Sequence, residues 1–190
     1  MAEKRTSRKE KKRVKDWYSV LAPQAFNNVQ IAEILGFEPE SIVGRKVEAT
    51  MQELGAGLSK QNYKFIFRIT EANGLQANTE FVGHTLMEGT ARVARKRHTK
   101  IDQVADVTTL DSRNLRLKVM AVTERKINRS QESAIRLRIV EKLKEDVSKL
   151  TLDELIRKLM SDSISADLFS ACKTVEPLRR LDVRASELTE

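Results

Sequence analysis

Residues 92–138 read RVARKRHTKIDQVADVTTLDSRNLRLKVMAVTERKINRSQESAIRLR, and they decide the fold because strand, turn, strand and helix patterns follow one another here. Ile101, Ala105 and Val107 alternate with polar neighbours, as the residues of a half-buried strand do. The DSRN sequence at 111–114 supplies turn chemistry. The next strand repeats the alternation at Leu115, Leu117, Val119 and Ala121. The stretch therefore predicts a β-hairpin with one basic face.

The first nine residues of this stretch, 92–100, hold five bases and no acid. Such a segment cannot neutralise itself, so it faces either a polyanion or open water, and a solvated face is the alternative for so short a run. The wider stretch predicts a nucleic-acid interface in which arginine forks contact phosphates and stack on bases. Its candidate RNA-binding residues are Arg92, Arg95, Lys96, Arg97, His98, Lys100, Arg113, Arg116, Lys118, Arg125, Lys126, Arg129 and Arg136.

The composition of the 190-residue chain agrees with a nucleic-acid binder. Its net charge is +8 and its sequence pI is near 9.7, values that a cationic membrane-surface protein would share. Hydrophobic residues make up 40% of the chain, enough to bury one core. The net charge alternates in blocks, with +6 over residues 1–15, −4 over 16–91, +8 over 92–140 and −2 over 141–190. One face and one tail are therefore expected to meet an anion.

Residues 1–16 are predicted to form a basic arm ahead of a single domain at 17–190. Val14 is the only sizeable hydrophobe after the initiator, so the arm has no apolar face to bury. It is expected to be disordered until phosphates replace its counterions, and a plain solubilising tail is the alternative. The candidate RNA-binding residues of the arm are Lys4, Arg5, Arg8, Lys9, Lys11, Lys12, Arg13 and Lys15.

The core is predicted to begin at residues 17–23, whose apolar and aromatic side chains indicate a first strand that Pro23 stops. Trp17 lies where the arm meets this strand. It is a candidate for stacking on an RNA base, and packing against the first strand is the alternative.

Three segments before the hairpin give further predictions. Residues 27–39 fit a short helix closed by Gly36. The periodicity of residues 44–54 fits a strand and a helix equally well. Thr85 is a candidate N-cap for a helical turn at 86–93.

The clearest strand is predicted at residues 62–71. Its aromatic and aliphatic face is expected to lie in the core rather than to stack on RNA, because the partner strand lacks basic neighbours. The residues of this face are Tyr63, Phe65, Phe67 and Ile69.

An Asn-Gly dipeptide at 73–74 then marks a chain reversal. A two-residue turn there would leave Phe67 opposite an acid. A register shifted by one residue would place Phe67 opposite Phe81 and Phe65 opposite Gly83, so burial favours a longer loop.

The C-terminal third is predicted to be mainly helical. A helix opening at Ser130 or Gln131 carries an apolar stripe with spacings of four and three, at Ile135, Ile139, Leu143, Val147 and Leu150. Thr151 and Glu154 form a capping-box signature that opens a second helix. Residues 165–173 fit a third helix, and a last strand is indicated by Leu178, Leu181 and Val183.

Four separated regions of the chain match one family in order and spacing. They are KDWYSVLAPQAF at 15–26, ESIVGRKVEATMQEL at 40–54, RKRHTKID at 95–102, and DELIRKL at 153–159 with CKTVEPLRRLDVR at 172–184. Over residues 13–185 the chain resembles the ribosomal protein S-three-A-e family, also called eukaryotic-type S-one, and its length resembles that of archaeal members. Members often carry an aromatic residue where Glu176 stands here.

That resemblance implies a component of the small ribosomal subunit of archaea and eukaryotes. It places the protein on the subunit platform near the 3′ end of the small-subunit rRNA, close to where mRNA exits. It also favours a strand over a helix at 44–54.

The sequence offers no candidate for catalysis, for a metal or for another cofactor. Cys172 is the single cysteine, which excludes an internal disulfide and fits a reducing compartment. His84 and His98 lack partners at zinc-ligand spacing, and the glycines form no phosphate-binding loop. The sequence also shows no export signal and no run that would span a membrane.

We therefore expect an α+β protein: a single compact domain with a mostly antiparallel β-sheet or barrel-like core flanked by C-terminal helices, plus a disordered basic arm. By resemblance, it is a structural constituent of the small ribosomal subunit in the cytoplasm. The expected partners are small-subunit rRNA and neighbouring ribosomal proteins, with mRNA near the exit site as a further candidate, but no membrane and no second copy of the chain. The alternative is a free-standing RNA-binding assembly factor or an RNA-modifying enzyme.

Overall fold

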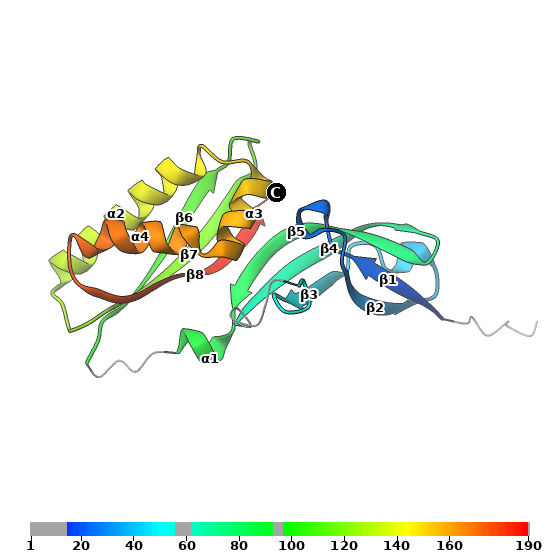
Figure 1. The fold of residues 1–190 in the computed structure, drawn as a ribbon, viewed down its shortest axis with the longest axis horizontal. Helices are drawn as coiled ribbons and strands as arrows, with labels where there is room; N and C mark the ends of the chain where they lie inside the picture. The colour runs from blue at the N-terminus through cyan, green and yellow to red at the C-terminus, as the bar shows by residue number, and fades with distance from the viewer. Residues whose placement is uncertain (1–14, 56–61, 93–96, 190) are drawn as a thin grey trace, which may run out of the picture.

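The computed structural model describes residues 15–55, 62–92 and 97–189, and its strands join in one sheet of eight (Figure 1). The strands are β1 (Asp16–Leu21), β2 (Gln30–Gly36), β3 (Lys46–Thr50), β4 (Tyr63–Asn73), β5 (Gln76–Leu86), β6 (Lys100–Thr108), β7 (Asn114–Thr123) and β8 (Leu178–Thr189). The helices are α1 (Glu88–Ala91), α2 (Arg129–Val147), α3 (Leu152–Ser161) and α4 (Ser163–Lys173). Two 3-10 turns, η1 (Gln24–Phe26) and η2 (Pro39–Ser41), flank β2.

The sheet runs in the order β2-β1-β5-β8-β7-β6, with β4 joined to β5 and β3 joined to β4. Only the β1–β5 pair is parallel among these pairings. The molecule has two halves: strands β1–β5 form an N-terminal half, and β6–β8 with α2–α4 form a C-terminal half (Figure 1). The predicted α+β fold, with a mostly antiparallel sheet and C-terminal helices, is confirmed.

The core of the N-terminal half is aromatic. Phe65 and Phe67 of β4 are buried, and both contact Phe26 of η1. The Phe26 and Phe67 rings meet edge to face, with centroids 5.2 Å apart and planes at 90°. Aromatic pairs prefer this geometry because the positive edge of one ring meets the negative face of the other. The prediction that this stripe is core is confirmed.

The β4–β5 hairpin reaches the predicted pairing by a different route. Phe67 lies opposite Phe81 as predicted, but Asn73 pairs with Gln76, so the turn has two residues and the predicted longer loop is wrong. Gly74 adopts a φ of 63°, which a turn this tight requires and glycine tolerates. Two irregularities in the pairing, between Ile66 and Phe67 and between Ile69 and Glu71, change the register instead. They place Phe65 opposite His84, so the predicted Phe65–Gly83 pair is also wrong.

The helix predicted for residues 27–39 is wrong, because this segment contains strand β2. Asn27 and Asn28 have φ values of 60° and 52°, which reverse the chain directly after η1. Residues 30–36 then pair antiparallel with β1, and Ile34 lies opposite Tyr18. The ambiguous segment 44–54 contains strand β3, as the family resemblance predicted.

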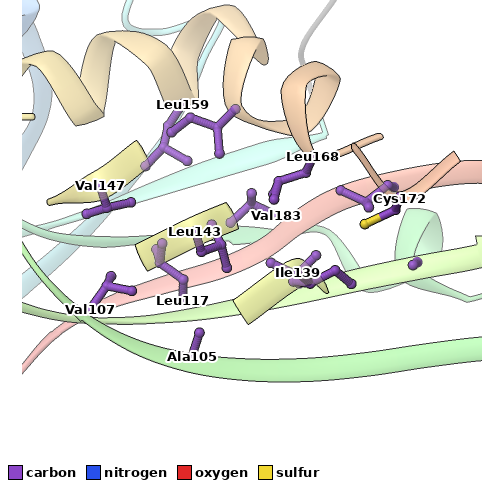
Figure 2. Close-up of a cluster of buried hydrophobic side chains, with 14 of the residues drawn as sticks. Ala105, Val107, Leu117, Ile139, Leu143, Val147, Leu159, Leu168, Cys172 and Val183 are labelled. Atoms are coloured by element: carbon purple, nitrogen blue, oxygen red, sulfur yellow. The ribbon is translucent and has the colours of Figure 1, made fainter. Parts of the chain in front are cut away.

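The core of the C-terminal half is aliphatic. Helix α2 packs on β6, and its buried stripe confirms the predicted apolar spacing at Ile135, Ile139, Leu143 and Val147. Figure 2 shows Ile139, Leu143 and Val147 lying with sheet residues Ala105, Val107 and Leu117. The helix begins at Arg129, one residue before the predicted start, behind an Asn128–Gln131 capping box.

The other predicted C-terminal elements are also confirmed. Thr151 and Glu154 form the predicted capping box of α3, with each side chain bonded to the backbone of the other residue. The third helix and the last strand are α4 and β8.

Strand β8 joins the two halves by pairing with both β5 and β7. At the β5–β8 seam the backbones approach so closely that a Cβ on Gly83 would lie 2.1 Å from the carbonyl oxygen of Ser186. His84 is buried beside it, with Nδ1 2.6 Å from Ser186 Oγ and Nε2 3.1 Å from Val183 O. Because a carbonyl only accepts, Nε2 carries the proton and Nδ1 accepts from the serine hydroxyl.

A short helical turn follows β5, as predicted, and is α1. The predicted N-cap is wrong: Thr85 lies within β5, and the residue before α1 is Met87, which makes no side-chain cap. The end of the predicted turn, residue 93, lies outside the described residues.

Candidate nucleic-acid interface

Cations of the C-terminal half gather where β6 begins and β7 ends. Lys100 of β6 pairs with Val122 of β7, and Val122 pairs with Arg180 of β8. The loop into α2 returns to the same place, because the Ile127 N–H donates to Thr99 Oγ1 at 3.3 Å. We call this region the basic end and define it by Arg97, His98, Lys100, Lys126, Arg129, Arg136 and Arg179.

His98 fixes one of these cations in place. Its Nδ1 lies 3.0 Å from Thr123 O and 2.8 Å from Glu124 O. Both partners are acceptors, so Nδ1 donates to them and Nε2 is left to accept. Arg179 Nη1 donates to this nitrogen at 3.1 Å, so the guanidinium lies beside the loop rather than free in solvent.

A hollow of about 460 Å³ opens beside this histidine at the start of β6. Its lining residues come from β6, from the 124–128 loop and from α2, and are His98, Thr99, Lys100, Asp102, Lys126, Ile127 and Arg136. Three lining cations face one lining carboxylate, so the hollow carries a net positive charge. A surface depression of this kind concentrates anions, because several cations act on the same volume.

The cations of the hollow differ in how far they are neutralised. Lys100 Nζ lies 3.3 Å from Asp102 Oδ2, and the Arg136 guanidinium contacts the Glu132 carboxylate one turn earlier in α2. Within the part of the chain that the structure describes, Lys126 forms no ion pair, unlike the other two. Lys126 is therefore the lining cation most available to an external phosphate.

A second, smaller hollow lies on the other side of Lys100. Its volume is about 210 Å³, and it is lined by Glu88, Arg92, Lys100 and Arg184. Arg92 lies 3.7 Å from Glu88 in an exposed pair, which contributes little by itself. This hollow extends the cationic surface of the basic end toward α1.

Arg125, one of the predicted RNA-binding residues, forms an ion pair with a buried carboxylate while its side chain stays 74% exposed. Its Nε donates at 3.1 Å to Glu176, whose second oxygen accepts from Gln131 Nε2 at 3.1 Å. Glu176 is buried, and buried polar side chains need hydrogen-bond partners such as these. This buried side chain ties the 124–128 loop to the start of α2.

Two predicted cations of the β6–β7 hairpin lie farther along the strands from the basic end, with Lys118 opposite Val104 in the middle of β6 and Arg116 opposite Asp106. Arg116 donates to both oxygens of Asp106, at 2.7 and 3.2 Å, and this contact lowers the pKa of the Asp106 carboxyl. Lys118 contacts Glu187 of β8. The open face of the hairpin is therefore mixed in charge, because acids stand beside these two predicted bases.

The turn of this hairpin carries the remaining predicted cation. Arg113 Nη2 lies 3.7 Å from Glu80 Oε1 of β5, and both side chains are about half exposed. The pair places Arg113 against the N-terminal half rather than with the basic end.

A third group of predicted RNA-binding residues lies where the arm meets β1. Trp17 is 59% exposed on β1, whereas its neighbour Tyr18 is buried. Lys15 Nζ lies 5.0 Å from the centroid of the Phe37 ring. Nine further predicted binding residues lie outside the described residues: Lys4, Arg5, Arg8, Lys9, Lys11, Lys12, Arg13, Arg95 and Lys96.

Sequence reasoning missed Arg179 and Arg184. Both lie in β8, in a C-terminal block whose net charge is −2, so composition gave no signal for them. Arg179 reaches the basic end, and Arg184 the smaller hollow beside it, because β8 pairs with β7 across a long sequence separation. Only knowledge of that pairing could have identified them.

Other reactive side chains lie inside the fold. Burial raises the pKa of the Cys172 thiol, which keeps it protonated and poorly nucleophilic. Burial lowers the pKa of His84 to about 4, so this imidazole is neutral at pH 7. Over residues 15–55, 62–92 and 97–189 no group of three or more His, Cys, Asp or Glu residues is placed to hold a metal ion. Within the same ranges no helix is long and apolar enough to cross a bilayer.

The fold and the hollow define an α+β protein with a cationic surface where β6 begins. The chain belongs to the Ribosomal S3Ae family, whose sequence model matches residues 3–190. The family resemblance read from the four sequence regions is therefore confirmed. Since this is a family of ribosomal proteins, the prediction that the chain is not an enzyme is confirmed as well.

Archaeal relatives cover nearly the whole chain. It is 34% identical over 189 residues to the small ribosomal subunit protein eS1 of Methanothrix thermoacetophila, covering 99% of this chain and 90% of that protein. It is 33% identical over 181 residues to the protein of the same name from Desulfurococcus amylolyticus, covering 95% and 85%. The corresponding protein of Thermoplasma volcanium is 34% identical over 181 residues, covering 95% and 84%.

Proposed function

We propose that this protein is a structural constituent of the small ribosomal subunit that binds small-subunit rRNA through its basic end and its N-terminal arm. Family membership supports the ribosomal role, because the relatives are named small ribosomal subunit proteins. The observation that carries rRNA binding is the cationic hollow at the start of β6. Its volume and its three cations suit one or more backbone phosphates.

The geometry supports binding to the phosphate backbone rather than to base edges. Lys126 and Arg136 reach the hollow from two different elements, so a phosphate between them would be held from two sides. Arg179, held by His98, adds a forked donor beside the same opening. The frame under these side chains is rigid, since α2 packs on β6 through buried aliphatic residues.

We further propose the organisation and setting that go with this role. Residues 1–16 act as a basic arm, and residues 17–190 act as one RNA-binding domain. Neighbouring small-subunit proteins are further partners, mRNA near the exit site is another, and the protein acts as one copy in the cytoplasmic ribosome. The negative net charge of residues 16–91, at −4, suits contact with basic neighbouring proteins.

The hollow can be tested by the salt dependence of binding to a small-subunit rRNA fragment. Each neutralised phosphate on single-stranded or loop RNA contributes roughly 0.7 to the slope of log K against log salt. Replacing Lys126 and Arg136 together with alanine should therefore flatten the slope by about 1.4 and weaken binding at low salt. Binding is measured with labelled RNA over a salt series, and incorporation is measured by co-sedimentation with salt-washed small subunits.

The matched control is the double variant Arg116→Ala and Lys118→Ala, which removes the same charge from the paired residues of the hairpin face. It should leave the slope nearly unchanged. Equal flattening by both variants would show that the positive charge acts without a defined site. An unchanged slope in the Lys126 and Arg136 variant would remove the hollow from the interface and leave the arm as the binding element.

A further inference from the structure

An exposed apolar cluster lies at the root of the arm, away from the basic end. Trp17 is 59% exposed, Phe37 is 45% exposed and Leu35 is 38% exposed. Trp17 lies directly opposite Leu35 in the β1–β2 pair. Lys15 directly precedes β1, Phe37 directly follows β2, and Lys15 Nζ lies over the Phe37 ring, so this second pair extends the array beyond Trp17 and Leu35. We call these four residues the arm-root cluster.

The arm-root cluster is held rigidly from behind. Tyr18 and Val20 of β1 are buried on the opposite face of the strand, where they pack with Ile42. Gly36 is needed there, because a Cβ at this position would lie 2.7 Å from Ile42 Cγ2. The strand that carries Trp17 therefore cannot turn its ring inward without breaking this packing. The exposed ring is a fixed feature of the fold.

Among the described residues nothing covers the rings of this cluster, as the exposure of Trp17 and Phe37 shows. Residues 1–14 carry seven bases and two acids, and Val14 is their one sizeable hydrophobe after the initiator. Such a composition suits phosphates and cannot bury an indole ring. A polyanion bound by residues 1–14 would, however, lie next to Trp17, since only Lys15 and Asp16 separate the two.

We propose that the arm-root cluster is a stacking site for unpaired RNA bases, with Trp17 as the main platform and Phe37 as a second ring. The proposal rests on the RNA-binding function proposed above and adds a base-contacting site to it. Aromatic rings on a rigid strand accept bases of any sequence, because every base presents a flat π surface. The nearby acid Glu33, which lies opposite Ser19, disfavours phosphate at the cluster itself, so the bases stack there while the arm holds the backbone.

The lysine of the cluster has a specific role in this arrangement. Lys15 Nζ lies 5.0 Å from the Phe37 centroid, within the range of a cation–π contact. It therefore holds one side of the Phe37 ring and places a positive charge between the stacking rings and the arm. A nucleotide on Trp17 would have its phosphate directed toward Lys15 and the basic residues that precede Lys15 in the sequence.

Trp17 is the only tryptophan of the chain, so its fluorescence reports on this site alone. The purified full-length protein is titrated at low salt with a short oligouridylate and with an abasic oligomer of equal length. Both ligands carry the same phosphates, but only the first has bases. We expect both to bind, and only the oligouridylate to quench Trp17 and to shield it from acrylamide.

Affinity variants supply a second readout, measured by the anisotropy of a labelled oligouridylate. Trp17→Leu keeps an apolar side chain but removes the aromatic ring, and should weaken binding about 5- to 150-fold. Trp17→Phe keeps a ring and should retain most of the affinity. Neither change should alter the salt slope, because no phosphate contact is lost. The matched control is Leu137→Ala, which truncates a 65% exposed side chain on α2.

The outcomes separate this proposal from the one on which it rests. Salt-dependent binding of both oligomers, without quenching or with equal quenching, would overturn base stacking and leave RNA binding by the arm intact. Binding of neither oligomer at low salt would overturn both proposals. Quenching by a basic peptide but not by oligouridylate would identify the cluster as a protein contact and overturn the stacking site.

Discussion

The two halves of the molecule fill their cores with different kinds of side chain. In the N-terminal half the strands curl, and rings from η1, β4 and β5 fill the interior around Phe67. In the C-terminal half the sheet is covered by α2 and α4, and branched aliphatic residues such as Ile139 and Leu143 interdigitate with it. The comparison shows that the basic end lies on the helix-backed half, where two layers support it, and the arm-root cluster on the curled half.

The largest expected effect tests whether the halves unfold together. Phe67→Ala should lower the free energy of unfolding by about 3–5 kcal/mol, and Leu143→Ala by about 2–5 kcal/mol, because each leaves a cavity in a buried core. Urea unfolding followed by circular dichroism measures both. If the continuous sheet makes one cooperative unit, both variants shift a single transition.

The control for both substitutions is Leu137→Ala on the exposed face of α2, which should change stability by less than about 0.5 kcal/mol. Two separate transitions, each moved by only one variant, would show that the halves are independent domains joined at the seam.

The next effect is the pH dependence of stability that His84 brings to the β5–β8 seam. The pKa of His84 is about 4 in the fold, because burial disfavours the charged ring, against an ordinary value of 6.5. The unfolded chain therefore binds the proton more readily. The contribution of neutral His84 to the free energy of unfolding is complete above pH 6.5. It is lost as the pH falls toward 4, by about 3 kcal/mol in all.

Comparison with His84→Gln isolates this contribution, since other carboxyl groups titrate in the same range. The wild type should lose more stability than the variant between pH 6.5 and pH 4, measured as the difference between their urea midpoints. Parallel pH profiles for the two proteins would mean that His84 is not the neutral buried group described here.

The smallest expected change in stability comes from the arm. Deleting residues 2–14 should leave the unfolding midpoint unchanged, because this segment has no apolar face, while binding to an rRNA fragment weakens and its salt slope flattens. A cooperative loss of thermal stability in the truncated protein would contradict this separation of arm and core.

Local patterns predicted much of the fold. The stripe of α2 and the capping box at Thr151 depend on residues within one or two turns, so the sequence contains all the information needed. The helix prediction for the β2 segment was wrong because Ile31, Ile34 and Leu35 fit a helix as well as a strand. The pairing with β1 makes the segment a strand. The aromatic pairing in β4–β5 was predicted, but the irregularities that produce it were not.

The candidate site was less predictable than the fold. The cations near His98 follow one another in sequence, so their grouping was visible. By contrast, Lys118 meets Glu187 and Arg179 meets His98 only through β8, which pairs with β7 at a long sequence separation. Charge counted along the chain therefore carried no information on the ion pairs of the hairpin face or on the two arginines of β8.

The place of β8 has a consequence for how the protein is made. Among the described residues, β5–β8 is the only strand pairing between the two halves, and β8 is synthesised after every strand that it joins. During translation each half can form its own hairpins early, because these depend on neighbouring segments. The sheet becomes continuous only when β8 leaves the ribosome, so until then the emerging chain is two partly folded units on a tether rather than one body.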